Sequence, residues 1–363
     1  MNFIYVVYDL HSENITNKQA MATERLGGIF EVAKMAGVTP AAVVNWRSRH
    51  TDFPEAVSSL QSGPVFNLDQ IQKWLRTRRK GMSTTISTIN LKGGVAKTTT
   101  TVALGEFLSE AFRKRVLIID LDPQTNATTM LIGEEKWDEL NRKGHTLATL
   151  FKDALDETHK FDLEKTRQKG VSNVRDVRTL DLIPSSLELI DVQDRLASMP
   201  SGRFYSNNPT EILRKAVRPI LEEYDYILID CPPNLGLITL NGLRISNGYI
   251  IPTIPDVLST FGIPQITTRV KAFAENIGEP LEPYGIVVSK YDSRSSLHNR
   301  TLKSLRDEKD KYPPTFSTVI PQSNAIGEAA EFTLVNTLRQ KYDYGNRYSQ
   351  FYNLTKEIIE AAG

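Results

Sequence analysis

The stretch that decides the fold is Asn90-Leu91-Lys92-Gly93-Gly94-Val95-Ala96-Lys97-Thr98-Thr99-Thr100. It follows a β-type run at 84–89 and precedes an apolar-periodic helix expected at 102–112. A strand, a glycine-rich loop and a helix in this order predict a phosphate-binding loop. Glycines lack a Cβ, so the backbone can fold tightly around an anion. The N–H groups of the loop and of the helix N-terminus then point at phosphate oxygens.

Two side chains of this loop are expected to carry its chemistry. Lys97 would hold the β- and γ-phosphates of a nucleotide, and the hydroxyl of Thr98 would ligate Mg²⁺. The loop departs from the common pattern G-x-x-x-x-G-K-[ST], because Leu91 and Ala96 stand where the two glycines belong. An extra lysine, Lys92, directly precedes the glycine pair.

The order of residues 92–98 resembles the deviant Walker A motif, K-G-G-x-x-K-T, of the ParA/MinD ATPases. In that family the early lysine reaches across a dimer to the nucleotide of the partner, which implies the same role for Lys92. The resemblance covers residues 84–363. It implies ATP and Mg²⁺ as cofactors and a homodimer as the active form.

Composition sets wider limits on the function. With 363 residues the chain has room for about two domains, and 40% hydrophobic with 24% charged residues is typical of a soluble globular protein. The formal net charge is +1, so attraction to nucleic acid requires a local basic patch. The single cysteine excludes an intramolecular disulfide and is consistent with a reducing cytosol. No apolar stretch approaches the roughly 20 residues that span a bilayer.

Three parts follow one another along the chain. We expect an N-terminal arm at 1–22, a small helical module at 23–80 and an alternation of apolar strands with helical patterns at 83–363. The alternation predicts an α/β fold of the P-loop NTPase type with a doubly wound, mostly parallel sheet. Expected strands lie at 85–90, 115–120, 179–183, 226–230, 248–253 and 284–289. Expected helices lie at 211–223, 263–277, 297–309 and 349–362. The polar segment 134–177 is interpreted as an irregular insertion.

Two aspartates follow the apolar run 116–119. Asp120 and Asp122 lie two residues apart, so both face the same side if the strand continues. The segment resembles the D-x-D-P-Q-x-N switch I region of the family. That resemblance implies that Asp122 positions the attacking water and that Asp120 supports the Mg²⁺ shell. Together with Lys92 and Lys97, Asp122 forms the expected catalytic set.

A third carboxylate ends the apolar run 226–229. Asp230 is followed by Cys231 and two prolines, which resembles the family's D-x-P-P signature. The resemblance implies that Asp230 holds Mg²⁺ through its water shell, beside Thr98 and Asp120. Cys231 is interpreted as a small buried hydrophobe.

Two later segments are candidates for the base pocket. Ser289 and Lys290 end one strand, and Pro321 and Gln322 follow another apolar pair. Both resemble family segments near the adenine, and a plain strand-to-loop transition explains either equally well. With them, the expected nucleotide-contacting set is Lys92, Gly93, Gly94, Val95, Ala96, Lys97, Thr98, Thr99, Ser289, Lys290, Pro321 and Gln322.

The module at 23–80 has the pattern helix, turn, helix. Gly37 would end the first helix, while Thr39 and Pro40 would begin the second. The pattern resembles the winged helix-turn-helix of MerR-like and excisionase-type modules, with a wing strand at 64–67 and a closing helix at 68–75. Its expected DNA contacts are Thr39, Asn45, Arg47 and Arg49. A small helical dimerisation domain is the alternative.

A second DNA-binding region is implied near the C-terminus, where the family binds DNA nonspecifically. The loop that usually carries an arginine, at 322–328, has none here. Substitute candidates are Arg294, Arg300, Lys303 and Arg306, followed by Arg339 and Lys341. Ordinary screened surface charge is the alternative interpretation.

The resemblance implies a ParA-type DNA-partition ATPase located in the cytoplasm on the nucleoid. In this interpretation ATP drives dimerisation and DNA binding, and a ParB-like centromere-binding partner stimulates slow hydrolysis. The N-terminal module suggests repression of the protein's own operon. A MinD-like membrane role is disfavoured by the acidic-to-neutral C-terminal segment. A cargo-positioning relative and a non-enzymatic ATP-gated regulator stay open.

Overall fold

The computed structural model describes residues 25–36, 40–49, 52–60, 63–79, 83–198, 208–323, 327, 331–342 and 346–363. The arm expected at 1–22 and the cap expected at Thr39 lie outside these residues. In the part of the chain that is described, no helix has the length and apolarity needed to cross a bilayer.

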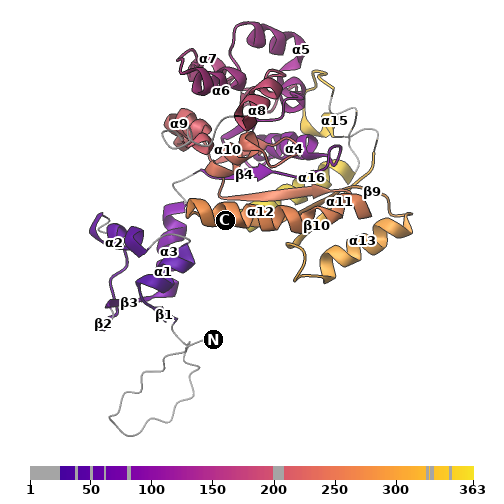
Figure 1. The fold of residues 1–363 in the computed structure, drawn as a ribbon. Helices are drawn as coiled ribbons and strands as arrows, with labels where there is room; N and C mark the ends of the chain where they lie inside the picture. Colours follow the sequence, from indigo (N-terminus) through magenta and orange to yellow (C-terminus); the bar gives the residue numbers. More distant parts are fainter. Residues whose placement is uncertain are drawn as a thin grey trace.

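A seven-stranded parallel sheet forms the centre of the larger part of the molecule (Figure 1). Its order is β10-β9-β8-β4-β7-β5-β6, so β4 is the middle strand. The strands are β4 (Thr84–Thr88), β5 (Val116–Asp120), β6 (Leu180–Ile183), β7 (Tyr226–Asp230), β8 (Gly248–Thr253), β9 (Glu282–Tyr291) and β10 (Thr315–Pro321). All six expected strands are present, and β10 is additional. The predicted doubly wound α/β fold is confirmed.

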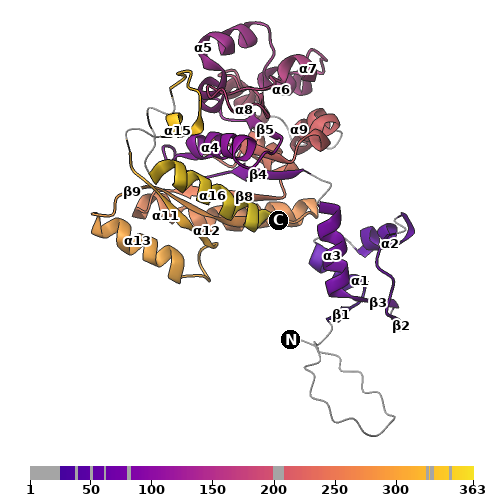
Figure 2. The same cartoon turned by 180° about the vertical axis from the view of Figure 1, so that it is seen from behind.

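Helices cover both faces of this sheet, as the two opposite views in Figures 1 and 2 show. One core holds α4 (Lys97–Glu110), the first half of α5 (Asn126–Arg142), α15 (Leu338–Lys341) and α16 (Asn346–Ala362) against the sheet. The other core holds α6 (Leu147–Asp156), α8 (Leu189–Ser198), α9 (Ile212–Val217), α10 (Leu237–Ile245), α12 (Ile263–Ile277) and α13 (Ser296–Asp307). The strands are buried on both sides, which explains their continuous apolar runs.

Two expectations about helices are wrong. The segment 134–177 is not irregular, because it contains the second half of α5, then α6 and α7 (Leu163–Thr166). Gly133, at φ 77° and ψ 163°, kinks α5 and interrupts its periodicity. The expected helix at 211–223 is instead η2 (Pro209–Glu211), α9 and η3 (Arg218–Glu223). Pro219 lacks the N–H that a continuous α-helix would require at this point.

A largely buried polar network joins α4 to α15. The Lys341 ammonium lies 2.7 Å from Glu106 Oε1 and donates to Asn173 Oδ1 at 2.7 Å. The hydroxyl of Tyr342 donates to Glu106 Oε2 at 2.7 Å, and that of Ser172 to Glu106 Oε1 at 2.7 Å. Lys341 is therefore not available to DNA, and its candidacy as a DNA contact was wrong. A lysine on a polar surface helix can still be buried when a carboxylate is buried opposite it.

The N-terminal module, residues 25–79, contains a smaller core. Its elements are β1 (Leu26–Gly27), α1 (Ile29–Ala36), α2 (Pro40–Arg49), β2 (Ser58–Leu60), β3 (Gly63–Asn67) and α3 (Leu68–Arg79). The three strands pair in the order β1-β3-β2. The core consists of Val32, Ala33, Val43, Phe53, Phe66, Ile71 and Trp74. Helices lie at the expected positions, and the strand β3 lies at the expected 64–67, where it forms a β-hairpin with β2. The assignment of this module to a winged helix-turn-helix stays a prediction.

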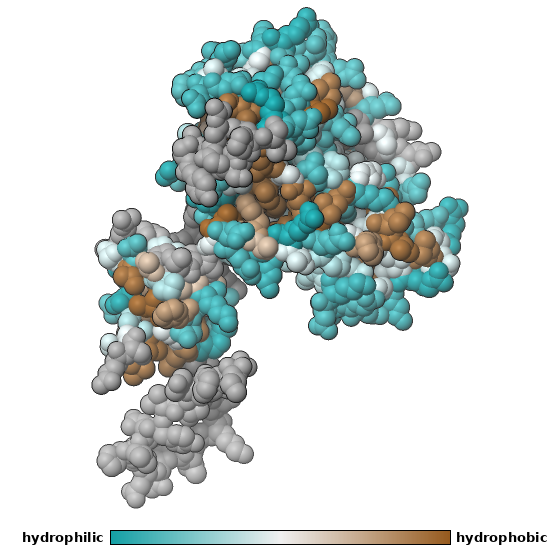
Figure 3. Space-filling model, viewed as in Figure 1, coloured by the Kyte–Doolittle hydropathy of each residue, from teal (hydrophilic) through white to brown (hydrophobic). Residues whose placement is uncertain are grey.

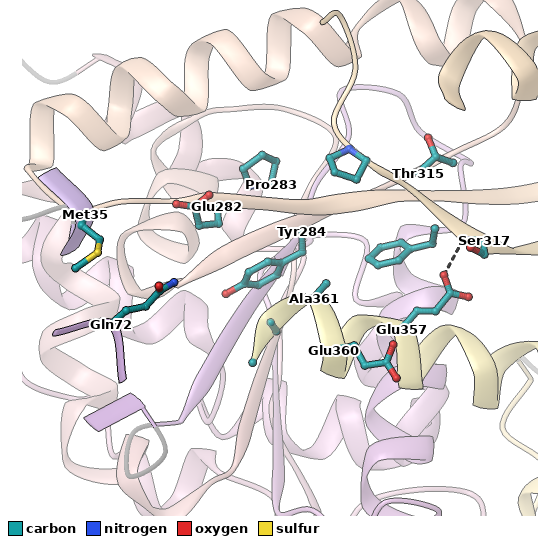
Figure 4. A pocket seen from close by; sticks show the side chains of 14 residues that line it. Met35, Gln72, Glu282, Pro283, Tyr284, Thr315, Ser317, Glu357, Glu360 and Ala361 are labelled. Carbon is teal, nitrogen blue, oxygen red and sulfur yellow. Dashed lines mark hydrogen bonds between the residues drawn. The ribbon is translucent and has the colours of Figure 1, made fainter. Parts of the chain in front are cut away.

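A cavity of about 770 Å³ separates this module from the sheet (Figure 4). Met35 and Gln72 line it on one side, and Glu282, Tyr284 and Glu357 on the other. Glu357 accepts hydrogen bonds from the backbone N–H groups of β10, at 2.6 Å from Ser317 and 2.9 Å from Thr318. Its acidic lining makes this cavity unsuited to a phosphate group.

Candidate nucleotide-binding site

The glycine-rich loop leaves the middle strand at the carboxyl edge of the sheet, where ligands bind in open α/β folds. Gly94 has φ +74°, and a Cβ built on Gly93 or Gly94 would meet no atom within 4 Å. Ala96, the last residue before α4, is also left-handed at φ 66°. The loop backbone therefore curls around an open space of the kind that an anion requires.

Hydrogen bonds to the neighbouring strands β8 and β9 hold this loop in place. The Asn90 side chain donates to the carbonyl of Pro252 at 2.8 Å and accepts from the N–H of Lys92 at 2.9 Å. The buried Ser289 hydroxyl donates to the carbonyl of Val95 at 2.9 Å. Ser289 thus supports the loop from behind, whereas a contact with the base had been expected. Val95 itself is fully buried.

The two lysines of the loop have different surroundings. Lys97 is 6% exposed, and its ammonium donates to the carbonyl of Lys92 at 3.2 Å, within the curl of the loop. Burial lowers the pKa of Lys97, and the carboxylates of Asp230 and Asp122 partly oppose this shift. A buried cation beside an open anion cradle is suited to bind phosphate.

Lys92 lies nearer the surface and contacts another segment of the chain. Its side chain is 37% exposed, and its ammonium donates to Ser259 Oγ at 2.9 Å and to Asp256 Oδ1 at 3.5 Å. The analysis of the sequence did not single out Asp256 and Ser259. They follow β8 at the carboxyl edge, so their position after an apolar run was the available signal.

Asp230 and Asp120 are register partners at the ends of adjacent strands, β7 and β5. The Thr98 hydroxyl donates to Asp230 Oδ2 at 2.7 Å. Burial, with repulsion from Asp122, raises the pKa of Asp230 to about 7. Burial and the nearby Asp230 raise the pKa of Asp120 well above its usual range.

Asp120 and Asp122 are tied to the start of α5. Asp120 Oδ2 accepts from both the N–H and the hydroxyl of Thr128, at 3.0 and 2.7 Å, and Oδ1 accepts from the N–H of Asp122 at 3.1 Å. Asp122 Oδ1 accepts from the N–H of Gln124 at 3.0 Å. Asp120 therefore holds the segment that carries Asp122 in place through its hydrogen bonds.

These residues fit a nucleotide with Mg²⁺. Three buried carboxylates with one buried lysine form a site with excess negative charge, which a divalent cation would offset. Thr98 and Asp230 would hold the ion, and both offer the oxygen atoms that Mg²⁺ prefers. The loop N–H groups and Lys97 would hold the phosphates.

The two candidate base segments lie side by side. Tyr291, which follows Lys290, pairs with Pro321, and the N–H of Gln322 donates to the Tyr291 carbonyl at 3.0 Å. Lys290 is exposed, with φ 50°. Both segments end at the carboxyl edge, as the phosphate loop does. Contact of Lys290, Pro321 or Gln322 with a base stays a prediction.

The candidate DNA contacts fall into two regions. On α2, Asn45 and Arg47 are exposed, and the Arg47 guanidinium lies over the Phe66 ring with 5.6 Å to its centroid. The side chain of Arg49 is outside the described part. On and near α13, Arg294 pairs with Asp292 at 3.0 Å and Arg306 donates to the carbonyl of Ser317 at 3.1 Å.

Arg300 and Lys303 are exposed one turn apart on α13. Within the described residues, neither of them has an ion-pair partner. They are therefore the cations of this region best placed to meet a phosphate backbone.

Comparison with known proteins identifies the family of the chain. A family model described as an AAA domain matches residues 83–282. The chain is 31% identical over 279 residues to the sporulation initiation inhibitor protein Soj of Bacillus subtilis, covering 76% of this chain and 98% of Soj. It is 30% identical over 243 residues to the chromosome partitioning protein ParA of Myxococcus xanthus, covering 67% and 77% of the two chains.

Among solved structures, cobyrinic acid a,c-diamide synthase from Mycobacterium smegmatis, with bound ADP and magnesium, superposes with a TM-score of 0.54. It is 27% identical, and the match covers 69% of this chain and 93% of that one. This neighbour supports nucleotide and Mg²⁺ as the ligands of the family. From the loop, the carboxylates and these relatives together, we conclude that the chain belongs to the ParA/MinD-type P-loop ATPases.

Proposed function

We propose that this protein is a ParA-like ATPase that partitions DNA. Binding of ATP and Mg²⁺ drives dimerisation, the dimer binds DNA, and hydrolysis stimulated by a ParB-like partner releases it. The observation that carries this proposal is the pair of lysines on one loop. Lys97 is buried within the curl of the loop, as a lysine that serves the phosphates of its own subunit would be, whereas the Lys92 side chain is 37% exposed and contacts Asp256 and Ser259 beside the loop.

Different residues of the chain bind the phosphates, bind the metal and orient the attacking water. When bound, Mg²⁺-ATP supplies the γ-phosphoryl group and a divalent charge that stabilises the transition state. Lys97 and the loop N–H groups hold the phosphates, and Thr98 and Asp230 hold the metal. Gln124 fixes one oxygen of Asp122. The other oxygen, to which no described residue donates, is free to orient the attacking water.

The relatives support the biological setting. Soj is named for sporulation control and the Myxococcus protein for chromosome partitioning. For this chain, DNA and a ParB-like protein are the proposed partners, and the nucleoid in the cytoplasm is the proposed location. Arg300 and Lys303 supply the proposed nonspecific DNA contacts.

Variants of the two lysines test the switch. Lys92→Ala should bind a fluorescent ATP analogue as the wild type does, because Lys97 still holds the phosphates, but should not dimerise. Lys97→Ala should lose nucleotide binding itself. Sedimentation velocity with a non-hydrolysable ATP analogue and Mg²⁺ measures dimerisation. A fully dimeric Lys92→Ala protein would contradict a lysine acting in trans.

Asp122→Ala distinguishes an ATPase from an ATP-gated regulator. We expect it to dimerise and bind DNA with ATP but to lose DNA-stimulated phosphate release. Wild-type protein that releases no phosphate with DNA, even with its genomic partner added, would favour the regulator.

A second role, operator binding, is favoured by the exposed Asn45 and Arg47 on α2. Asn45→Ala combined with Arg47→Ala should abolish a mobility shift on the protein's own promoter and leave nonspecific DNA binding intact. Wild-type protein that retains the promoter no better than unrelated DNA would exclude autorepression.

A further inference from the structure

Ser185 lies two residues after β6, and its side chain contacts the segment that carries Asp122. β6 pairs with β5 in parallel, so the two strands end at the same edge of the sheet. Ser185 is fully buried, and its hydroxyl donates to the carbonyl of Asp122 at 2.7 Å. Its N–H donates to Thr128 Oγ1 at 3.0 Å. One residue of a neighbouring strand therefore holds both ends of the segment 122–128.

This segment turns sharply between β5 and α5. The carbonyl of Asp122 also accepts from the N–H of Thr125 at 3.0 Å, which closes a turn. Thr125 has φ 58°, in the left-handed region that residues other than glycine rarely adopt. A strained backbone of this kind persists only where the surrounding structure holds it. The Ser185 hydroxyl is one of the groups that hold it, and it reaches the turn from outside the segment.

The adjacent serine contacts a different part of α5. The hydroxyl of Ser186, which is also fully buried, donates to Asn141 Oδ1 at 2.6 Å, and the carbonyl of Ser185 accepts from the indole N–H of Trp137 at 3.2 Å. These residues belong to the half of α5 after the kink, in which only Leu140 is buried. Figure 3 shows a mainly hydrophilic surface at the top of the view, where Figure 1 places α5. Ser186 thus ties down a surface helix, whereas the Ser185 hydroxyl reaches the nucleotide site.

We propose that Ser185 is a positioning residue for ATP hydrolysis and acts through Asp122, an inference that rests on the proposed ATPase function. The N–H of Gln124 fixes the Asp122 carboxylate relative to its own backbone. The Ser185 hydroxyl fixes that backbone relative to the sheet, which also carries the phosphate loop and Asp230. A displacement of about 1 Å at a reacting group can cost on the order of 100-fold in rate. Ser185 therefore determines where the attacking water is held, and other residues bind the phosphates and the metal.

Ser185→Ala separates this placement from nucleotide binding. The variant leaves the Asp122 carbonyl its hydrogen bond from the Thr125 N–H, so this buried group keeps a partner. In the full chain we expect the turnover number for DNA-stimulated phosphate release to fall by about tenfold or more, because the carboxylate is no longer held in place. The KM for ATP and the affinity for a fluorescent ATP analogue should be unchanged.

Ser186→Ala is the matched control, because it removes an equally buried hydroxyl from the next residue, and it should keep the wild-type turnover number. If Ser185→Ala does not fold, Ser185→Cys replaces it and is judged by the same criterion, since a thiol has a similar shape and is a weaker donor.

A Ser185 variant with the wild-type turnover number would overturn the positioning role and leave the ATPase standing. An equal loss of turnover in Ser186→Ala would also overturn it, since packing of the chain after β6 would then be responsible. A raised KM with an unchanged turnover number would assign Ser185 to nucleotide binding instead. Wild-type protein that releases no phosphate with DNA, even with its genomic partner added, would overturn both the ATPase and the role of Ser185.

Discussion

Ala96 occupies a left-handed backbone conformation that L-residues rarely adopt. The common phosphate-loop pattern has glycine at this position, so the chain tolerates a strained alanine there. We expect Ala96→Val to destabilise the protein by about 1–2 kcal/mol, because a β-branched side chain is disfavoured at positive φ. Urea unfolding measures the stability, and titration with a fluorescent ATP analogue measures the accompanying loss of affinity.

Ala96→Gly is the control for this prediction. Glycine adopts the same φ without strain, so nucleotide affinity should be kept. Equal stability of the valine and glycine variants would show that the backbone at Ala96 relaxes out of the left-handed region.

Most residues of the site could be predicted because each lies in a short local motif. Lys97 and Thr98 follow the glycine pair, and Asp230 ends an apolar run, so the chemistry is visible in the order of residues. Asp256 could not be predicted as the partner of Lys92, because the two are 164 residues apart along the chain. Ser289 was one candidate for the base pocket, because its position at a strand end does not reveal which way the hydroxyl turns.

At the scale of elements, the buried network of Glu106 and Lys341 fixes α15 on the helix that begins with the phosphate loop. We expect Lys341→Met to destabilise the protein by about 3–5 kcal/mol, because it leaves the Glu106 carboxylate buried without its cation. The free energy of unfolding in urea is the measurement.

Arg339→Met provides the matched control on the same short helix. Arg339 is exposed and lies over the ring of Tyr348, with 4.1 Å to the centroid, so its loss should cost less than about 1 kcal/mol. The double variant Glu106→Leu with Lys341→Met should recover much of the stability, since no charge is then left buried. If Arg339→Met costs as much stability as Lys341→Met, and the double variant recovers none, then the network stabilises the protein through packing rather than through its charges.

Six of the seven strands of the sheet could be predicted from sequence, and β10 could not. Runs such as 226–229 are apolar throughout because both faces of the strand are buried. β10 lies at the edge of the sheet, where exposed Ser317 interrupts the apolar pattern. The second half of α5 was missed because the kink at Gly133 resets the helical period.

At the scale of the whole molecule, net charge is nearly zero, so DNA binding depends on where the cations stand. We expect Arg300→Ala combined with Lys303→Ala to weaken ATP-dependent binding to all DNA sequences alike. The measured quantity is the slope of log affinity against log salt concentration. Each lost phosphate contact reduces the magnitude of this slope by about 1, so the double variant should reduce it by about 2. Fluorescence anisotropy over a salt series measures it.

Arg294→Ala is the control for the DNA prediction, because Asp292 already neutralises this arginine. Its slope should stay close to that of the wild type. If the slope is unchanged when Arg300 and Lys303 are both replaced, these residues of α13 do not contact DNA, and nonspecific binding uses another surface.

The position of β4 in the middle of the sheet has a consequence for the order in which the protein is made. The strand pairs on both sides with later segments, β7 and β8, and Thr98 meets Asp230 132 residues further along the chain. At a synthesis rate of roughly 5–20 residues per second, the complete loop leaves the ribosome on the order of 10 s before its metal-side carboxylate. A nascent chain therefore contains the complete loop before the carboxylate that pairs with Thr98 has been made. Binding of Mg²⁺ and nucleotide by the loop and Asp230 together requires that β7 has already paired with β4.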